Sequence, residues 1–560
     1  MDPKIYNESI KEFSDKEVRQ LNFEVSRSIA NKIKTMYGPK GLSKMIIPVT
    51  NETIITQKGI SVVKTFKSRV PITLMLINLV ETQEKKCGDG TKTVLLFTAF
   101  LLEKAREMLN QGISAPIINK GFSIALRKVL EKIDDNVIAL NGHYDEKFVD
   151  IISSVMNNKL TSSSKDYYIN LILDTIVNNK SILIDSEDFD YTNIIFRKIK
   201  GKSVNESEVI KGIIIYKDKP TSNVPNKILK PKILLVQSSL EFFLPSNDEP
   251  FQKDVIIADI EKYKEFTQFK PTYYKNLANF FKEKGIDVIL CKKKISPFLI
   301  EYCASIGMVA LGLVGKDQLK KLSKMLKIKP ISSIKEFSEA EIGKADIAEY
   351  KAVTEDEMFI IKKEDSGILT FLLRGGTPHV LDELEEIINA SLRVGIQTLK
   401  DKKLLPGGGA LESELSLELK KYAGEFSDKY QYVISEYGKA LENLPAYLIM
   451  NSANDPYDLI PNLKAEHSLK KKYMGFDSIS NTITNVVSKG IFDGYTAKKT
   501  AIKIGTEMAR QILRVDGLVM VYNRKLYEKI EEEGKNTKKL KHQEKVRKYF
   551  KKNEKDITFT

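Results

Sequence analysis

The sequence has few of the residues that bind metals or form disulfides. There are three cysteines and four histidines in 560 residues. They are Cys87, Cys291, Cys303, His143, His379, His467 and His542. Three scattered cysteines are too few for a disulfide framework, and no Cys–His spacing typical of a zinc site occurs. A Gly-x-Ser-x-Gly elbow and a Cys/His nucleophile signature are also missing. The sequence therefore argues against covalent and metalloprotease-type catalysis.

Long apolar runs are missing too. No stretch approaches the roughly 18 consecutive apolar residues that a membrane span needs. The N-terminal segment MDPKIYNESIKEFSDKEVRQ carries charges where a secretory signal needs an apolar core. We therefore expect a cytosolic protein with no membrane partner. Because a single core stops growing near roughly 250–300 residues, a chain of 560 residues predicts two or three domains.

The net charge of +15 raises the question of nucleic-acid binding. Much of the excess lies in the tail NRKLYEKIEEEGKNTKKLKHQEKVRKYFKKNEKD (523–556), where acidic residues are interspersed. No RNP, zinc-finger or helix-turn-helix signature accompanies it. We expect a solvated tail, partly helical or disordered, and nucleic-acid binding through this tail is the alternative.

Helical and α/β patterns alternate along the chain. Residues 17–40 and 93–140 are predicted to be helical, as are 379–401, 410–424 and 497–516. Between them, short β-rich runs alternate with helical patterns such as 274–285. The runs are 212–216, 232–236, 287–291, 308–314 and 359–362. This order predicts an α/β domain inserted into a helical domain, whose two outer parts must meet in space.

The turn CGDGTKT (87–93) precedes an apolar helical segment and has the features of a phosphate site. Gly88 and Gly90 allow the backbone to approach an anion, and the positive end of the next helix points at the turn. Thr91 and Thr93 offer hydroxyl groups, and Asp89 offers an oxygen ligand for magnesium. Asp-Gly is also a common turn dipeptide, so this segment alone leaves an ordinary turn open.

Two further glycine turns strengthen the phosphate interpretation. MYGPKGLSKMI (36–46) ends one predicted helix, and LLPGGGALESEL (404–415) places Gly407, Gly408 and Gly409 before another. Each could be a simple helix cap or connector. Three such turns in the helical outer parts could instead converge on one anion.

Several motifs occur in an order that resembles the group II chaperonins, the ring-forming, ATP-driven folding machines of archaea and the eukaryotic cytosol. They are YGPKGLSKMI, GDGT, GISAPIINKGFSIAL, RGGT, PGGGALESEL and GFDSISNTITNVVSKGIFDGYTAKKTAIKIGTEMARQILRVDGLVM. The resemblance covers roughly residues 15–525. Within the family, TLKDKKLLPGGGALESEL and ILRVDGLVM are most similar to one eukaryotic paralogue.

This resemblance implies a mixed α and β, three-domain architecture. A helical equatorial domain would comprise 1–140 and 401–525, and a small intermediate domain 141–211 and 365–400. Residues 212–364 would form an α/β apical domain that binds client proteins. It would carry a helical protrusion, the lid, beginning within 240–269. Residues 526–560 would form a basic tail.

The resemblance also implies which residues contact ATP or ADP and Mg. Gly38 and Pro39 would lie by the phosphates, and Gly408 by the ribose or base. Asp493 matches the family aspartate that contacts the nucleoside. The phosphate cradle would comprise Gly88, Asp89, Gly90, Thr91, Lys92 and Thr93, with Asp89 on magnesium.

Three positions depart from the family pattern. Lys58, in ITQKGISVV, stands where the family has an aspartate that positions water and cation. Counting back from the triple glycine puts Ala390 in place of the presumed catalytic base, and a slip of one residue would offer Asn389, which is no base either. Lys92 replaces the middle threonine of the cradle.

These departures predict that nucleotide binds but is hydrolysed weakly or not at all, with no catalytic carboxylate at 58 or 390. Loss of a general base alone commonly lowers a rate by about 10²–10⁴-fold. The Lys58 ammonium would pair with phosphate oxygens, unless the side chain points to solvent.

The family resemblance implies one subunit of a cytosolic double ring, with paralogous subunits as neighbours and unfolded proteins such as actin and tubulin as clients. A stand-alone ATP-utilising enzyme remains the alternative, although the α/β region shows no set of acid, base and nucleophile.

Overall fold

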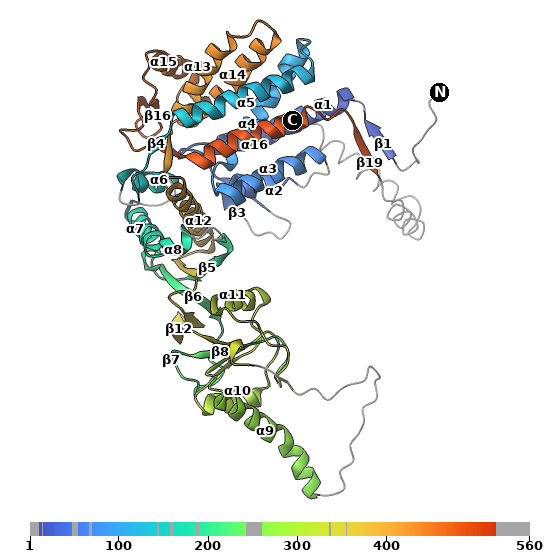
Figure 1. Cartoon of the computed structure of the whole chain (residues 1–560), viewed down its shortest axis with the longest axis vertical. Coiled ribbons are helices and arrows are strands. Elements are labelled where there is room, and N and C mark those ends of the chain that lie inside the picture. The colour runs from blue at the N-terminus through green and yellow to red at the C-terminus, as the bar shows by residue number, and fades with distance from the viewer. Residues whose placement is uncertain are drawn as a thin grey trace.

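The computed structural model describes residues 10–13, 15–47, 54–66, 70–142, 145–156, 162–184, 190–241, 260–334, 338–353 and 356–521. The molecule is elongated (Figure 1). A helical region containing segments from both ends of the chain lies at one end, and an α/β region from the middle of the chain lies at the other. Within the described ranges, no helix combines the length and the hydropathy needed to cross a bilayer.

The helical region is built from amphipathic helices that bury their apolar faces against one another. These are α1 (Asp15–Ile33), α2 (Gly59–Lys64), α3 (Pro71–Cys87), α4 (Thr91–Asn110), α5 (Ala115–Asp135), α13 (Ala410–Ala423), α14 (Lys429–Asn451), α15 (Pro456–Ser468) and α16 (Tyr495–Ile512). Three antiparallel pairs flank them: β1 (Ile10–Phe13) with β19 (Leu518–Val521), β2 (Lys44–Ile46) with β3 (Ile54–Thr56), and β16 (Met474–Asp477) with β17 (Thr482–Asn485).

The two outer chain segments share one hydrophobic core. Phe97 on α4 and Phe122 on α5 are fully buried and meet the Tyr437 ring of α14, each with ring centroids 5.6 Å apart. A small sheet joins the same segments, because β15 (Lys403–Pro406) pairs with both β4 (Ile138–Ala139) and β18 (Phe492–Gly494). The insertion is therefore bracketed by strands that lie next to each other.

A linking region lies between the two ends of the molecule. It contains α6 (Glu146–Met156), α7 (Ser162–Asn178), α8 (Lys180–Leu183) and α12 (Pro378–Asp401). Its six-stranded sheet runs β5-β14-β6-β13-β12-β7. The strands are β5 (Ile194–Lys200), β14 (Leu369–Gly375), β6 (Glu208–Tyr216), β13 (Asp356–Lys362), β12 (Ile347–Val353) and β7 (Lys227–Leu229). This sheet continues from the linking region into the α/β region.

Strand β6 changes its partner in mid-strand. Lys211 pairs with β14, whereas Gly212 pairs with β13. Gly212 has φ of 149°, and a Cβ there would lie 2.0 Å from the Ile361 carbonyl oxygen, so only glycine fits. The change of partner lies between residues 211 and 212, and the domain limit that we expect there stays a prediction.

The α/β region also contains a four-stranded sheet of order β10-β9-β8-β11. It consists of β10 (Val309–Leu311), β9 (Val288–Cys291) and β8 (Lys232–Val236) in parallel and β11 (Ile342–Lys344) antiparallel. Helices α9 (Ile260–Glu283), α10 (Pro297–Ser305) and α11 (Lys316–Leu326) accompany it. The mixed α and β class predicted from the sequence is confirmed, and each predicted β-rich run contains a strand.

Two helix predictions were wrong in detail. Residues 93–140 do not form one helix: α4 ends at Asn110 and α5 begins at Ala115, with Gly112 between them at φ of 83°, and 138–139 is a strand. The helix expected over 17–40 ends at Ile33 and is followed by a 3-10 turn, Lys34–Met36. Most of the expected start of the protrusion (242–259) and the tail after 521 lie outside the described residues; residues 260–269 belong to α9.

The side chain of His467 fixes α15 to its neighbours. It is fully buried, with Nδ1 2.7 Å from Glu414 Oε2 and Nε2 2.8 Å from the Met474 carbonyl oxygen. The ring therefore links the Glu414 carboxylate of α13 to the backbone of β16.

We predict that His467→Leu lowers the stability of the helical region by about 1–3 kcal/mol, because Glu414 and the Met474 carbonyl lose their donor. Thermal unfolding should shift down by a few degrees. Ser468→Ala is the control: its hydroxyl is exposed and bonds only the Lys464 carbonyl within its own helix. Equal transition temperatures for the two variants would contradict the prediction.

Candidate functional site: a cavity between the helical region and α12

One cavity of about 710 Å³ gathers all the site residues expected from the sequence. Its volume lies within the range of roughly 300–1,000 Å³ typical of small-molecule sites. Its walls come from the helical region, from α6 and from the α12 helix of the linking region. The expected residues that line it are Gly38, Pro39, Lys58, Gly88, Asp89, Gly90, Thr91, Lys92, Thr93, Ala390, Gly408 and Asp493.

The turn between α3 and α4 is shaped as a cradle. Gly88 and Gly90 have φ of 70° and 80°, in the left-handed region that favours glycine. Gln83 holds the turn by donating from Nε2 to the carbonyl oxygens of Asp89 (2.8 Å) and Ala497 (3.0 Å). The N-terminus of α4 lies at the cavity wall, so the positive end of the helix dipole suits an anion.

Lys92 ties this cradle to the turn around Gly38. Its Nζ donates to the Met36 carbonyl oxygen at 2.8 Å, at the end of the 3-10 turn. Gly59 packs on the other side, since a Cβ there would lie 3.1 Å from Lys92 Cγ and 3.3 Å from Thr91 Oγ1. Lys92 thus braces two walls of the cavity.

Lys58 is the residue before α2 and lines the cavity. Its Nζ lies 3.9 Å from Glu84 Oε1, and about a quarter of the side chain (27%) is exposed. Burial raises the pKa of Glu84, while the charges of Lys58 and Arg393 oppose that rise. A cation therefore stands beside the cradle at the position where the family resemblance leads us to expect a carboxylate.

On α12, Ala390 faces the cavity, and Asn389 does not line it. The amide oxygen of Asn389 instead accepts from Arg393 Nε at 3.1 Å. The register of the helix therefore brings the methyl group of Ala390 to this wall, while the carboxylates that α12 contributes to the cavity, Glu383 and Glu386, lie one to two turns earlier.

Sequence reasoning missed Glu386, which also lines the cavity. Its Oε2 accepts from the buried Thr56 hydroxyl at 3.2 Å, so it joins α12 to β3. Glu386 lies one helical turn before Ala390, about 6 Å along the axis, and does not take the place of a carboxylate at 390. The sequence did carry a signal for it: Glu386 precedes Ala390 by four residues, and residues four apart lie on the same face of a helix.

Lys498, Glu412 and Tyr37, near Asp493, were also missed. Lys498 Nζ lies 2.5 Å from Glu412 Oε1 and 2.8 Å from Asp493 Oδ2. Burial alone would lower the pKa of Lys498, but the two carboxylates raise it well above its ordinary value. Burial also raises the pKa of Tyr37, which lines the cavity and hydrogen-bonds Thr93.

The residues present fit a nucleoside phosphate. Left-handed glycines and a helix N-terminus suit the phosphates at one end, and Asp493 and the positive-φ Gly408 stand at another wall. Among the described residues, no three His, Cys, Asp or Glu side chains are grouped to hold a metal ion by themselves. Asp89 is the carboxylate of the cradle itself.

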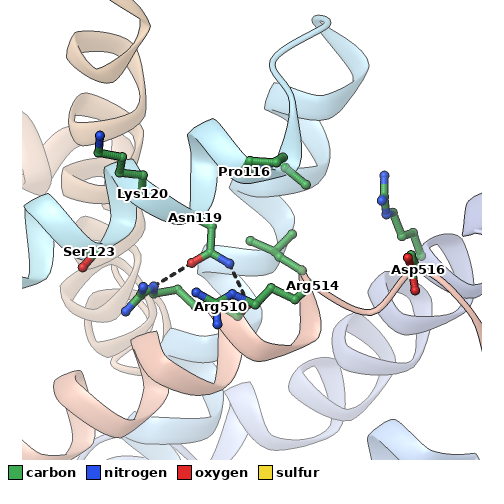
Figure 2. A pocket seen from close by; sticks show the side chains of 10 residues that line it. Pro116, Asn119, Lys120, Ser123, Arg510, Arg514 and Asp516 are labelled. Carbon is green, nitrogen blue, oxygen red and sulfur yellow. Dashed lines mark hydrogen bonds between the residues drawn. The ribbon is translucent and has the colours of Figure 1, made fainter.

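A second cavity, of about 500 Å³, lies where the start of α5 meets the end of α16 (Figure 2). Cationic side chains line it, and two of these side chains, Arg510 and Lys120, have partners within the protein. Arg510 Nε donates to Asn119 Oδ1 at 2.7 Å, and the Lys120 ammonium lies 5.5 Å from the Tyr430 ring centroid. These contacts explain the two side chains without a ligand.

The split helical region, the inserted α/β region and the glycine-lined cavity together define the class of protein. Residues 29–523 match the TCP-1/cpn60 chaperonin family, and because this match covers most of the chain, the protein belongs to that family. The family predicted from the sequence is confirmed.

Archaeal thermosome subunits are among the most similar relatives. Thermosome subunit alpha of Thermoplasma acidophilum is 30% identical over 505 residues, which cover 90% of this chain and 92% of the relative. Thermosome subunit alpha of Halobacterium salinarum is 28% identical over 516 residues, covering 92% and 90%. A thermosome subunit of Pyrococcus abyssi is 28% identical over 520 residues, covering 92% and 93%.

We predict that Gly90→Ala lowers the unfolding temperature more than Gly112→Ala does. Both positions have φ near 80°, so both substitutions carry the left-handed strain of about 1–2 kcal/mol. Only at Gly90 would the new Cβ also lie 2.7 Å from Gln83 Nε2, whereas nothing lies within 4 Å at Gly112. Differential scanning calorimetry checks the difference, and equal shifts would show that the cradle is not tightly braced.

Proposed function

We propose that this chain is one subunit of a cytosolic, hetero-oligomeric double-ring chaperonin that assists the ATP-dependent folding of proteins such as actin and tubulin. Among the eukaryotic paralogues it is most similar to the theta subunit of TRiC. The observation that carries the proposal is the convergence of distant segments: 38–39, 58, 88–93, 390, 408 and 493 line one cavity. Membership of the chaperonin family and the thermosome relatives support it.

In this proposal the cavity binds ATP or ADP with Mg. The cradle around Gly90 and the N-terminus of α4 hold the phosphates, and Asp89 provides an oxygen ligand for magnesium. Asp493 and Gly408 hold the nucleoside. A bound magnesium ion would supply positive charge to the phosphate oxygens.

The subunit hydrolyses this nucleotide weakly or not at all. Phosphoryl transfer depends on positioning of water and on charge stabilisation, and two carboxylates that serve those roles in the family are replaced by Lys58 and Ala390. Lys58 lies beside the cradle and is positioned to pair with phosphate oxygens.

Exposed aromatic side chains in the α/β region support client binding. Phe269 and Tyr273 on α9 are 53% and 39% exposed, and Phe298 on α10 is 46% exposed. Unfolded clients offer apolar segments that such rings can contact.

The hairpin β2–β3 supports assembly with neighbouring subunits. Met45 on β2 and Ile55 on β3 are 66% and 50% exposed, and Ile47, just after β2, is 69% exposed; in the described part of the chain these two strands form a sheet of their own. Exposed apolar strands of this kind are liable to pair with another chain. A ring of related subunits provides such a partner.

Lys58→Asp combined with Ala390→Asp should restore hydrolysis at this site, because both carboxylates return. Assembled particles trapped with magnesium, ADP and aluminium fluoride would be imaged by cryo-electron microscopy. We expect an ordered attacking water and a planar fluoride in the double variant and neither in the wild-type subunit. The control, Lys58→Met with Ala390→Ser, removes the lysine without adding a carboxylate. An ordered attacking water and a planar fluoride in the wild-type pocket would contradict the proposal of weak hydrolysis.

Met45→Lys with Ile55→Lys should prevent this chain from entering the large particle. Native mass measurement of complexes purified through a tag on the chain gives the answer. The wild type should be found in an assembly near a megadalton with related chains of similar size. Leu229→Lys is the control, since Leu229 is 68% exposed on β7, far from the hairpin. A wild-type chain that is a stable monomer would favour a stand-alone ATP-utilising enzyme instead.

A further inference from the structure

A buried charged triad forms the cavity wall next to Asp493. The Lys498 side chain is 8% exposed and contacts the carboxylates of Glu412, 1% exposed, and Asp493, 35% exposed. Lys498 comes from the first turns of α16, Glu412 from the first turn of α13 and Asp493 from β18. The triad therefore joins three elements at one wall.

The contacts divide the two carboxylates into different roles. Glu412 is buried, and its charge is neutralised by Lys498. Asp493 uses Oδ2 for Lys498 and is partly exposed on the cavity wall. Within the part of the chain that the structure describes, no hydrogen bond is made to Asp493 Oδ1. One acceptor oxygen is thus held by the protein, and the other remains for a ligand.

The triad also reaches the phosphate end of the cavity. Tyr37 lies close enough to Lys498, Glu412 and Asp493 for their charges to act on its hydroxyl, and that hydroxyl hydrogen-bonds Thr93 of the cradle. A rigid, buried ammonium between these groups fixes the direction of the Asp493 carboxylate. Without it, Asp493 would be free to turn, and Glu412 would keep an uncompensated buried charge.

We propose that Lys498 is a positioning residue for nucleoside recognition: by holding Oδ2 it directs Oδ1 of Asp493 at an O–H or N–H donor of the nucleoside. This inference rests on the proposed function, in which Asp493 faces the nucleoside. The donor is a ribose hydroxyl or the amino group of the base, since both present a hydrogen to a carboxylate. A site built to accept such a hydrogen rejects analogues that lack it.

The experiment measures nucleotide selectivity at this chain within the assembled particle. A photo-reactive 8-azido-ADP labels the site, and ADP, 2′-deoxy-ADP, 3′-deoxy-ADP and IDP compete. In the wild type we expect one analogue to compete at least tenfold less well than ADP. A deoxy analogue identifies a ribose hydroxyl as the donor, and IDP identifies the amino group.

Lys498→Met should reduce this discrimination to less than threefold. The matched control is Lys499→Met, because Lys499 is the next residue of α16 but pairs with Asp134 at 2.7 Å, and neither lines the cavity. Lys498→Met with Glu412→Gln removes the buried charge left on Glu412 and keeps the test valid where the single variant folds poorly. Asp493→Asn should lose the same discrimination, and adding Lys498→Met to it should cause no further loss.

The outcomes separate the inference from the proposed function. No labelling of the wild-type chain overturns the proposed nucleotide site. Labelling with unchanged selectivity in Lys498→Met overturns the inference alone. An equal loss of affinity for ADP and all analogues in Lys498→Met shows a merely structural lysine and also overturns it.

Discussion

The close approach of α4 and α16 is the contact on which the rest of the structure depends. Gly505 permits it, because a Cβ there would lie 3.1 Å from Thr98 Oγ1 and 3.3 Å from the Val94 carbonyl oxygen. Thr98 Oγ1 also lies 3.3 Å from the Gly505 carbonyl oxygen, and Tyr437 meets Thr506 at 2.7 Å. This packing joins a helix from the first quarter of the chain to one near its end. It places the cradle at the start of α4 next to the first turn of α16, which carries Lys498.

Much of the fold could be predicted from local patterns. The helical spacing of Phe122, Leu126, Val129 and Ile133 holds in α5, whose buried face contains all four. The break before it was missed although its signals were present: Ser114 precedes the helix and Pro116 stands in its first turn. The strand 138–139 could not be predicted locally, because its two residues are a strand only through pairing with β15, more than 250 residues later.

The site residues that belong to a short sequence motif could be predicted. Those that reach the cavity only because of how a helix is oriented could not. Gly88 and Gly90 allow the positive φ angles of the turn, and this need is visible in the local sequence, as are the threonines that follow. Lys498 and Lys499 look alike in the sequence, yet adjacent helical positions point about 100° apart. One side chain is buried between two carboxylates, and the other contacts Asp134 at the surface. Glu386 follows the same rule, since only the orientation of α12 brings it to Thr56.

Lys58 and Ala390 stand where the family resemblance leads us to expect carboxylates. Both differences change the charge around the cavity. A carboxylate beside bound phosphates repels them and must be offset by a metal ion, so it is retained where it organises that ion and the attacking water. A lysine at the same place attracts the phosphates of reactant and product alike. Because it attracts both equally, the lysine increases the affinity for nucleotide without lowering the barrier of the chemical step. On the proposed function, Lys58 and Ala390 therefore act together: one favours retention of nucleotide, and the other removes the group that would consume it.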